Sequence, residues 1–285
     1  MRFFVKTPLL SAGLLAGLVL LAAPALAETL AEKTLKGIVA RERDILSRAD
    51  KEGDQLDEAR LRGELQNVIN SYDILIQKNP EFAPGYVAYG LLLGKVGMNR
   101  EAVPMLLKAN KLDPEIPLVK NEVARHLAED GKLVEAMPWL MAAIDLAPKE
   151  PLYHYHLGKL LAEGRDDFIR TGQFTRPALD QAMLDAFRRA AELAPDSLPY
   201  AYRHAEAYYD LETPQWDAAL KAWAALEKRA KPGIEQETIR LQAANVLLKL
   251  GQTDHARLLL ANVTQGALQK QKQTLLDQLA PKSEK

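Results

Sequence analysis

Two closely spaced histidines are the first residues in this chain that could do chemistry. His154 and His156 lie in PLYHYHLGKLL, residues 151–161, and imidazole is a common ligand of zinc. Two residues apart on a helix, they project from different sides, because side chains that meet on one helix face are three or four positions apart. The position four after His154 is Gly158, which offers no ligand. We therefore expect no metal site here and interpret both histidines as core or edge residues.

No other residues form a recognisable catalytic or cofactor-binding pattern. His126, His204 and His255 have no carboxylate or second histidine at ligand spacing, and the adjacent Asp166 and Asp167 have no evident acid or base partner. The sequence contains none of the G-x-S-x-G, H-E-x-x-H, P-loop or G-x-G-x-x-G motifs. It also has no cysteine, which excludes disulfides, thiolate metal sites and thiol nucleophiles. We predict a protein that is not an enzyme and that binds no cofactor or metal.

Composition points to helices packed through small residues. Of the 285 residues, 48% are hydrophobic but only 6% are aromatic, and Ala and Leu are abundant. The 37 basic residues are balanced by 38 acidic ones, a formal net charge of −1. Without a basic excess, the chain is not expected to bind nucleic acid.

The N-terminal segment has the pattern of a secretory signal peptide over residues 1–27. Arg2 and Lys6 precede an apolar stretch, and Ala25-Leu26-Ala27 provides small residues at a cleavage site. We expect cleavage before Glu28, a periplasmic or secreted mature protein, and no membrane span after removal of the signal. The alternative is an uncleaved membrane anchor, because the apolar stretch approaches the length of a span.

One phrase of the sequence occurs twice, with a period of 34. GMNREAVPMLLKANKLDP, residues 97–114, and GKLVEAMPWLMAAIDLAP, residues 131–148, are identical at eight of 18 positions. Counting back one period from Pro114 finds Pro80 as well. A fixed period of this length is typical of stacked helix pairs, in which neighbouring units bury each other's apolar faces.

The period and the residue types resemble the tetratricopeptide-repeat family. In the unit that begins at Ala83, the family's consensus positions fall on Tyr86, Tyr89, Gly90, Leu93, Ala102, Leu106, Ala109 and Pro114. The next two units, which begin at Pro117 and Pro151, place Ala124 and Gly158 at the position of Gly90, where the helices of a pair must approach closely. The resemblance implies an all-α, right-handed solenoid of antiparallel helix pairs, each made of a helix A and a helix B.

The repeat pattern also suggests how the chain is divided. We expect a charged helix pair at 28–80 to be a degenerate capping repeat, because Val68 stands where the period requires a small residue. The tetratricopeptide-like solenoid spans 81–263, with looser units after Pro195. A C-terminal capping helix and tail follow at 264–285, where Leu268, Leu275, Leu276 and Leu279 form one apolar stripe.

The third unit carries an insertion near 163–181. Pro148 and Pro195, which end successive B helices, are farther apart in the sequence than one period. Phe168, Ile169 and Phe174 would be costly to expose, so the inserted segment either folds back onto the solenoid or meets a partner.

The resemblance further implies a concave groove lined by the A helices. Of the positions that line it in the family, we single out as tentative partner-binding residues Asn121, Arg125, Tyr155, Lys159, Tyr202, Glu206 and Tyr209. Tyr155 and Tyr202 are expected to be near neighbours on successive A helices. Tyrosine and arginine are enriched in protein interfaces because they combine large contact area with hydrogen bonding. Ordinary half-exposed helix residues are the alternative interpretation.

From these features we predict an exported, non-catalytic scaffold that binds a protein or peptide of unknown identity in this groove. The alternative function is a structural component of an envelope assembly, which docks through its convex face or the 163–181 loop.

Overall fold

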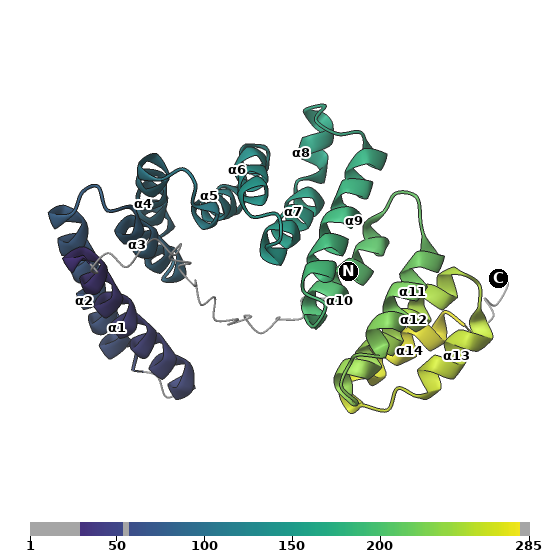
Figure 1. Cartoon of the computed structure of the whole chain (residues 1–285). Coiled ribbons are helices and arrows are strands. Elements are labelled where there is room, and N and C mark those ends of the chain that lie inside the picture. Colours follow the sequence, from purple (N-terminus) through teal and green to yellow (C-terminus); the bar gives the residue numbers. More distant parts are fainter. Residues whose placement is uncertain (1–28, 54–56, 280–285) are drawn as a thin grey trace. The chain divides into compact units, whose positions relative to one another are not determined.

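The computed structural model describes residues 29–53 and 57–279 (Figure 1), and the predicted signal peptide lies outside these residues. All regular elements in the described ranges are helices, which confirms the predicted all-α class. The chain divides into two compact units, an N-terminal one that ends at Pro80 and a C-terminal one that begins at Glu81.

The N-terminal unit is a pair of long helices, α1 (Leu30–Glu52) and α2 (Glu58–Lys78). A capping box at Thr29 and Glu32 fixes the start of α1 by satisfying two backbone N–H groups that have no partner inside the helix. Tyr72 is fully buried between the helices, and its hydroxyl donates to Glu42 Oε2 at 2.8 Å. Val68 is also fully buried. The pair is thus held by branched and aromatic side chains rather than by a close crossing at small residues.

The C-terminal unit begins with three helix pairs in the predicted register. The A helices α3 (Ala83–Lys95), α5 (Pro117–Glu129) and α7 (Pro151–Glu163) start at equivalent positions of successive repeats and have the same length. Their B partners are α4 (Asn99–Leu112), α6 (Leu133–Leu146) and α9 (Arg176–Leu193). A proline in the first turn of each A helix supports this register, because its missing N–H would have no intrahelical partner there.

The turns between helices A and B explain where the insertion begins. Gly97 and Gly131 have φ angles of +81° and +76°, which close the tight turns after α3 and α5. In each turn the following residue donates back to the last helical turn, as in Met98 N–H to the Leu93 carbonyl at 2.8 Å. The equivalent residue after α7 is Arg165, whose side chain disfavours a positive φ. There the chain continues into the short helix α8 (Arg165–Arg170).

The close crossing of helices A and B is confirmed at the two repeat glycines. A Cβ atom on Gly90 would lie 2.9 Å from Leu106 Cδ2, and one on Gly158 would lie 2.6 Å from Cε1 of Phe187. Real Cβ contacts are not this short, so the helix spacing requires glycine at these positions.

The apolar residues of the insertion fold back onto the solenoid. Phe168 is completely buried in the core shared by α5, α6, α7 and α9, and its ring packs edge-on against Phe174 with centroids 6.0 Å apart. Ile169 packs against the same core. The full burial of Phe168 and the partial burial of Ile169 and Phe174 favour fold-back of the insertion onto the solenoid.

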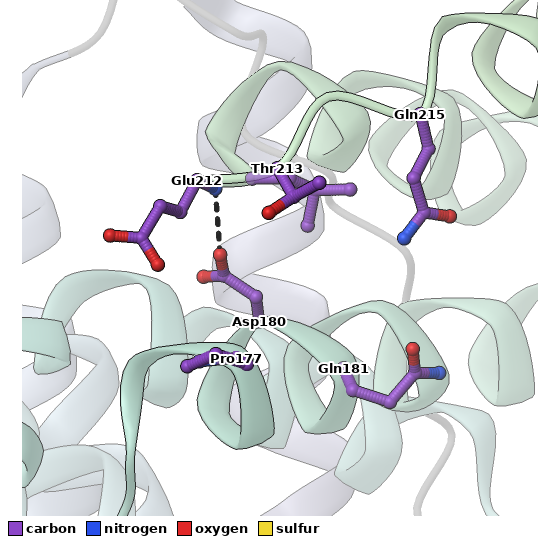
Figure 2. A pocket seen from close by; sticks show the side chains of 7 residues that line it. Pro177, Asp180, Gln181, Glu212, Thr213 and Gln215 are labelled. Carbon is purple, nitrogen blue, oxygen red and sulfur yellow. Dashed lines mark hydrogen bonds between the residues drawn. The ribbon is translucent and has the colours of Figure 1, made fainter.

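Polar contacts tie the insertion to the segment that follows α10 (Leu198–Ala207). Arg165 and Arg176 both donate to the Asp210 carbonyl, at 3.1 and 2.9 Å. The Asp180 carboxylate accepts from Arg176 at 2.9 Å and from the Glu212 backbone N–H at 2.7 Å, the bond drawn in Figure 2. These contacts satisfy backbone groups that an irregular segment would otherwise leave unpaired.

The remaining helices extend the stack. A short 3₁₀ turn, η2 (Tyr208–Asp210), ends α10, and α11 (Trp216–Glu227), α12 (Ile234–Lys249) and α13 (Thr253–Ala261) follow. A further 3₁₀ turn, η3 (Gly266–Leu268), leads into α14 (Gln269–Asp277). Leu268 and Leu279 are buried against α12 and α13, with Leu275 and Leu276 packed alongside. This arrangement covers the apolar face of the last helix pair.

Gly158→Ala is expected to destabilise the C-terminal unit by roughly 1–3 kcal/mol, because Phe187 is fully buried and has no room to move from the new methyl group. Gly63→Ala, inside α2 where a Cβ meets nothing within 4 Å, is the matched control and should stabilise by about 0.5–1 kcal/mol. Denaturant titration followed by circular dichroism measures both changes. Equal effects of the two substitutions would contradict the close crossing.

Phe168→Ala is expected to cost about 3–5 kcal/mol of unfolding free energy, because it removes a completely buried aromatic ring. Arg170→Ala in the same short helix changes an exposed side chain and should stay within about 0.5 kcal/mol of wild type. Urea unfolding of the two variants tests this difference. A Phe168→Ala variant as stable as wild type would show that the insertion is not anchored in the core.

Candidate functional site

A hollow of about 180 Å³ lies between α5 and α7, and we call it the α5–α7 pocket. Three of the predicted groove residues, Asn121, Arg125 and Lys159, are brought together there. The complete lining is Asn121, Ala124, Arg125, Ala128, Glu129, Leu140, His156, Lys159, Leu160 and Glu163. Its residues come from two successive A helices and, through Leu140, from the B helix between them.

The floor of the pocket is apolar. Ala124, Leu140 and Leu160 are buried members of the core, and Ala128 packs against the same core. The two alanines leave space that larger side chains would fill. The volume is close to that of an engineered cavity of about 150 Å³ that binds benzene. The pocket therefore has the size and the lining to accept one apolar side chain.

Arg125, on the rim, is fully engaged within the protein. Its Nε donates to Glu122 Oε2 at 2.9 Å, and its two terminal nitrogens contact Glu129 Oε1 at 2.5 Å and His126 Nε2 at 3.1 Å. Two carboxylates already pair with its guanidinium, so Arg125 organises the rim and has little capacity to hold a ligand.

Lys159 is the more available cation. Its side chain is 46% exposed, and its ion pair with Glu163 on the next turn of α7 spans 3.7 Å. A pair of this length between exposed side chains is weak and exchanges easily with other partners. A ligand that reaches the rim therefore meets Lys159 and Glu163 with little competition from the fold.

A buried polar network connects α5 with α7. Asn121 is only 1% exposed, and its Nδ2 donates to Glu122 Oε1 at 3.1 Å. Its Oδ1 accepts from His156 Nδ1 at 2.7 Å. The interpretation of His156 as a core or edge residue did not include its hydrogen bond to Asn121. The repeat pattern could have indicated this contact. The position equivalent to Asn121 in the next unit is residue 155, and His156 is the residue that follows it.

Burial keeps His156 neutral at neutral pH. Loss of hydration around the charged ring, reinforced by the positive charges of Lys159 and Arg125, lowers the pKa of His156 to about 4. The histidine therefore acts in the pocket as an uncharged hydrogen-bonding group.

Tyr155 and Tyr202 do not form the pair expected from the sequence. The ring of Tyr155 packs against Phe187 on α9 and against Tyr200 on α10, with centroids 5.9 and 5.3 Å apart. Tyr202 instead packs edge-on against Trp223 of α11 at 5.0 Å. Tyr200 is thus the α10 neighbour of Tyr155. Both predicted groove tyrosines are half-buried and contribute to the core as well as to the surface.

The other two predicted residues on this part of the chain differ in accessibility. Glu206 is exposed and lies 3.6 Å from Arg203. Tyr209, predicted to continue helix A, lies in the 3₁₀ turn η2, and its hydroxyl donates to the Gln242 carbonyl of α12 at 3.0 Å. The helix stops because contacts with the insertion hold the backbone at Asp210 and Glu212. Tyr209 therefore joins neighbouring helices.

A second hollow, of about 190 Å³, lies between the start of α9 and the segment that precedes α11 (Figure 2). Asp180 is its buried charged group, and Arg176, Arg165 and the Glu212 N–H already surround its carboxylate. Gln181, Thr213 and Gln215 complete its polar lining. The charge of Asp180 is used by the fold, so this hollow offers less to a ligand than the α5–α7 pocket.

The two closely spaced histidines of α7 have separate partners. His154 Nε2 contacts the Pro148 carbonyl at 2.9 Å, whereas His156 faces Asn121. Within residues 29–53 and 57–279, no group of three or more His, Asp or Glu side chains is placed to hold a metal ion. In the same ranges, no helix combines the length and the apolar character needed to cross a bilayer.

His156 is expected to make stability pH-dependent. The unfolded chain should protonate it near pH 6.5 and the folded protein only near pH 4, so the unfolded state binds more protons between these values. The contribution of neutral His156 to the free energy of unfolding is fully present above pH 6.5. It should fall by roughly 2–3 kcal/mol as the pH approaches 4. His156→Gln should lose less stability over this window, whereas His126 and His204, whose pKa values are also lowered, contribute equally to both proteins. Urea unfolding at pH 4–7 measures the free energy of unfolding of both proteins. If it changed with pH in the same way in wild type and in His156→Gln, the low pKa would not belong to His156.

Comparisons with known proteins identify the fold. No protein-family model matches the sequence, and no curated protein is a significant sequence match. Among solved structures, YrrB, described as a TPR protein with an unusual peptide-binding site, has a TM-score of 0.53 at 17% identity over 72% of this chain and 92% of its own. The type IV pilus biogenesis factor PilW gives 0.58 at 14% identity over 88% and 100%. PilF of Pseudomonas aeruginosa gives 0.53 at 13% identity over 85% and 99%. The chain therefore has the fold of the tetratricopeptide-repeat proteins.

Proposed function

We propose that this protein is a non-catalytic scaffold that binds a segment of another protein between its A helices, with the α5–α7 pocket as the anchoring point. The observation that carries the proposal is the combination of an apolar floor of about 180 Å³ with the exposed Lys159 and Glu163 on its rim. Apolar pockets with a few polar groups at the edge are the usual form of binding sites.

The arrangement of the pocket favours a peptide over a small metabolite. Its rim carries charges of both signs, and it is partly open to solvent. An extended or helical segment could place one side chain on the floor while its neighbours contact the rim. The aromatic side chains Tyr155 and Tyr200 lie next to one another beyond the pocket and would lengthen the contact surface. On the basis of the N-terminal sequence, we propose that this binding takes place after export.

A second candidate function is assembly through the B helices. Leu107 on α4 and Met141 on α6 occupy equivalent positions of successive repeats and are 42% and 41% exposed. Exposed apolar residues repeated in register suit a contact with another component of an envelope assembly. The 163–181 segment contributes less to this alternative than expected, because Phe168 is buried in the core and Ile169 and Phe174 pack against it.

A photo-crosslinking amino acid placed at position 159 or at position 141 distinguishes the two functions. With a probe at 159, the proposed function predicts a discrete cross-linked partner that is lost when Ala128→Leu fills the pocket. The assembly function predicts a cross-link from position 141 that Ala128→Leu leaves unchanged. A probe at Arg188, which is exposed on α9 and forms ion pairs with Asp185 and Glu192 of the same helix, gives the background.

Cross-linking is analysed by gel shift and mass spectrometry, with circular dichroism to confirm that each variant is folded. A cross-link from 141 without one from 159 would overturn the pocket as the binding site. Identical products from 159 and 188 would show nonspecific contact and would also count against it.

A further inference from the structure

One ring nitrogen of His156 is left free at the α5–α7 pocket. Nδ1 is bound to Asn121, while Nε2 has no hydrogen-bond partner among the described residues. Some polar atoms in the described part of the chain are buried and have no hydrogen-bond partner, and Nε2 is not among them. Nε2 is therefore not sealed from solvent. His156 lines the pocket and is half-buried, so we infer that the ring edge carrying Nε2 is the edge that faces the pocket.

The surrounding network fixes which ring nitrogen carries the proton. Glu122 is held by Arg125, and its carboxylate can only accept, so the Asn121 atom that contacts it must be the amide nitrogen. The Asn121 oxygen then faces His156, and an amide oxygen also only accepts. Nδ1 of His156 must therefore donate, which leaves Nε2 as a lone-pair acceptor. The low pKa of His156 agrees with this uncharged form.

We propose that the α5–α7 pocket selects a peptide segment that places an apolar side chain on its floor and donates an N–H hydrogen bond to His156 Nε2. The proposal rests on the function proposed above and adds a chemical requirement to it. A ligand with only acceptor atoms at this point would leave Nε2 without a partner after water is excluded, which is unfavourable. An apolar group beside an N–H is the arrangement that satisfies both the floor and the acceptor.

Every charged group at the rim lies beside one of opposite sign, which favours a neutral anchor. Arg125 is paired with both Glu122 and Glu129, and Lys159 lies beside Glu163, so these five groups carry a net charge of −1. An acidic group is disfavoured by this excess of carboxylates, and a basic group meets only carboxylates that already have a cation beside them. A side chain such as leucine or tryptophan together with a backbone or indole N–H fits the pocket better than a charged residue.

Indole and benzofuran test the requirement directly with the full chain. The two molecules have nearly the same shape, but only indole carries an N–H donor. We expect indole to bind roughly 2- to 10-fold more tightly than benzofuran, the range that one net hydrogen bond provides. NMR titration at millimolar concentration measures both affinities. In the wild-type protein, the His156 Nε2 resonance should shift on addition of indole and hardly at all with benzofuran.

His156→Phe should remove the preference for indole and leave the binding of benzofuran unchanged or stronger. His154→Phe makes the same chemical change two residues away, at a histidine that contacts the Pro148 carbonyl, and should keep the preference. The Nε2 measurement on wild type keeps the test valid if His156→Phe does not fold.

The outcomes separate this inference from the proposed function. Equal binding of indole and benzofuran, with no Nε2 shift, would overturn the hydrogen-bond requirement while leaving the pocket as an apolar anchor. Failure of both molecules to bind would overturn the requirement even if the probe at position 159 cross-links a partner. Loss of that cross-link with intact indole selectivity would instead overturn the scaffold function and leave the pocket chemistry standing.

Discussion

The fold depends on the distance at which helix A crosses helix B. At Gly90 and Gly158 the partner side chain occupies the space of a Cβ atom, so the two backbones are as close as packing allows. This spacing lets a short helix bury most of one face against its partner and still present the other face to the next pair. Helices as short as α3 and α4, which would be marginal alone, are stable in this arrangement because neighbouring pairs cover each other.

The third repeat shows what replaces the repeat geometry when one element of it is lost. Arg165 stands where the earlier units have a turn glycine, and the chain leaves the repeat at that residue. The insertion is then secured by a new set of contacts, with Phe168 in the core and two arginines on the Asp210 carbonyl. Because Asp210 belongs to the following repeat, the irregularity spreads beyond the inserted residues and shortens α10. A local change in turn chemistry thus alters the next unit through tertiary contacts.

This difference explains what could be predicted from the sequence. The starts of α3, α5 and α7 follow from a strict period with proline in each first turn, and they were correct to the residue. The glycine positions at the helix crossings followed from the same pattern. The end of α10 and the surroundings of Tyr209 did not, because they are set by Arg165, Arg176 and Asp180 across a long sequence separation. The sequence likewise grouped Tyr155 with Tyr202, whereas the side-chain packing pairs Tyr155 with Tyr200.

In the candidate site, some residues hold the pocket in shape and others are free to contact a ligand. Arg125 drew attention in the sequence as a long cation on the groove, yet the structure assigns it to holding Glu122, which orients Asn121 and, through Asn121, His156. Removing Asn121 would leave the Nδ1–H group of His156 without its acceptor, so the position of the His156 ring depends on this series. Its consequence is a neutral acceptor in a fixed position beside an apolar floor. A pocket built in this way has paid its ordering cost during folding, and the free energy of binding then depends on how well the incoming segment matches it.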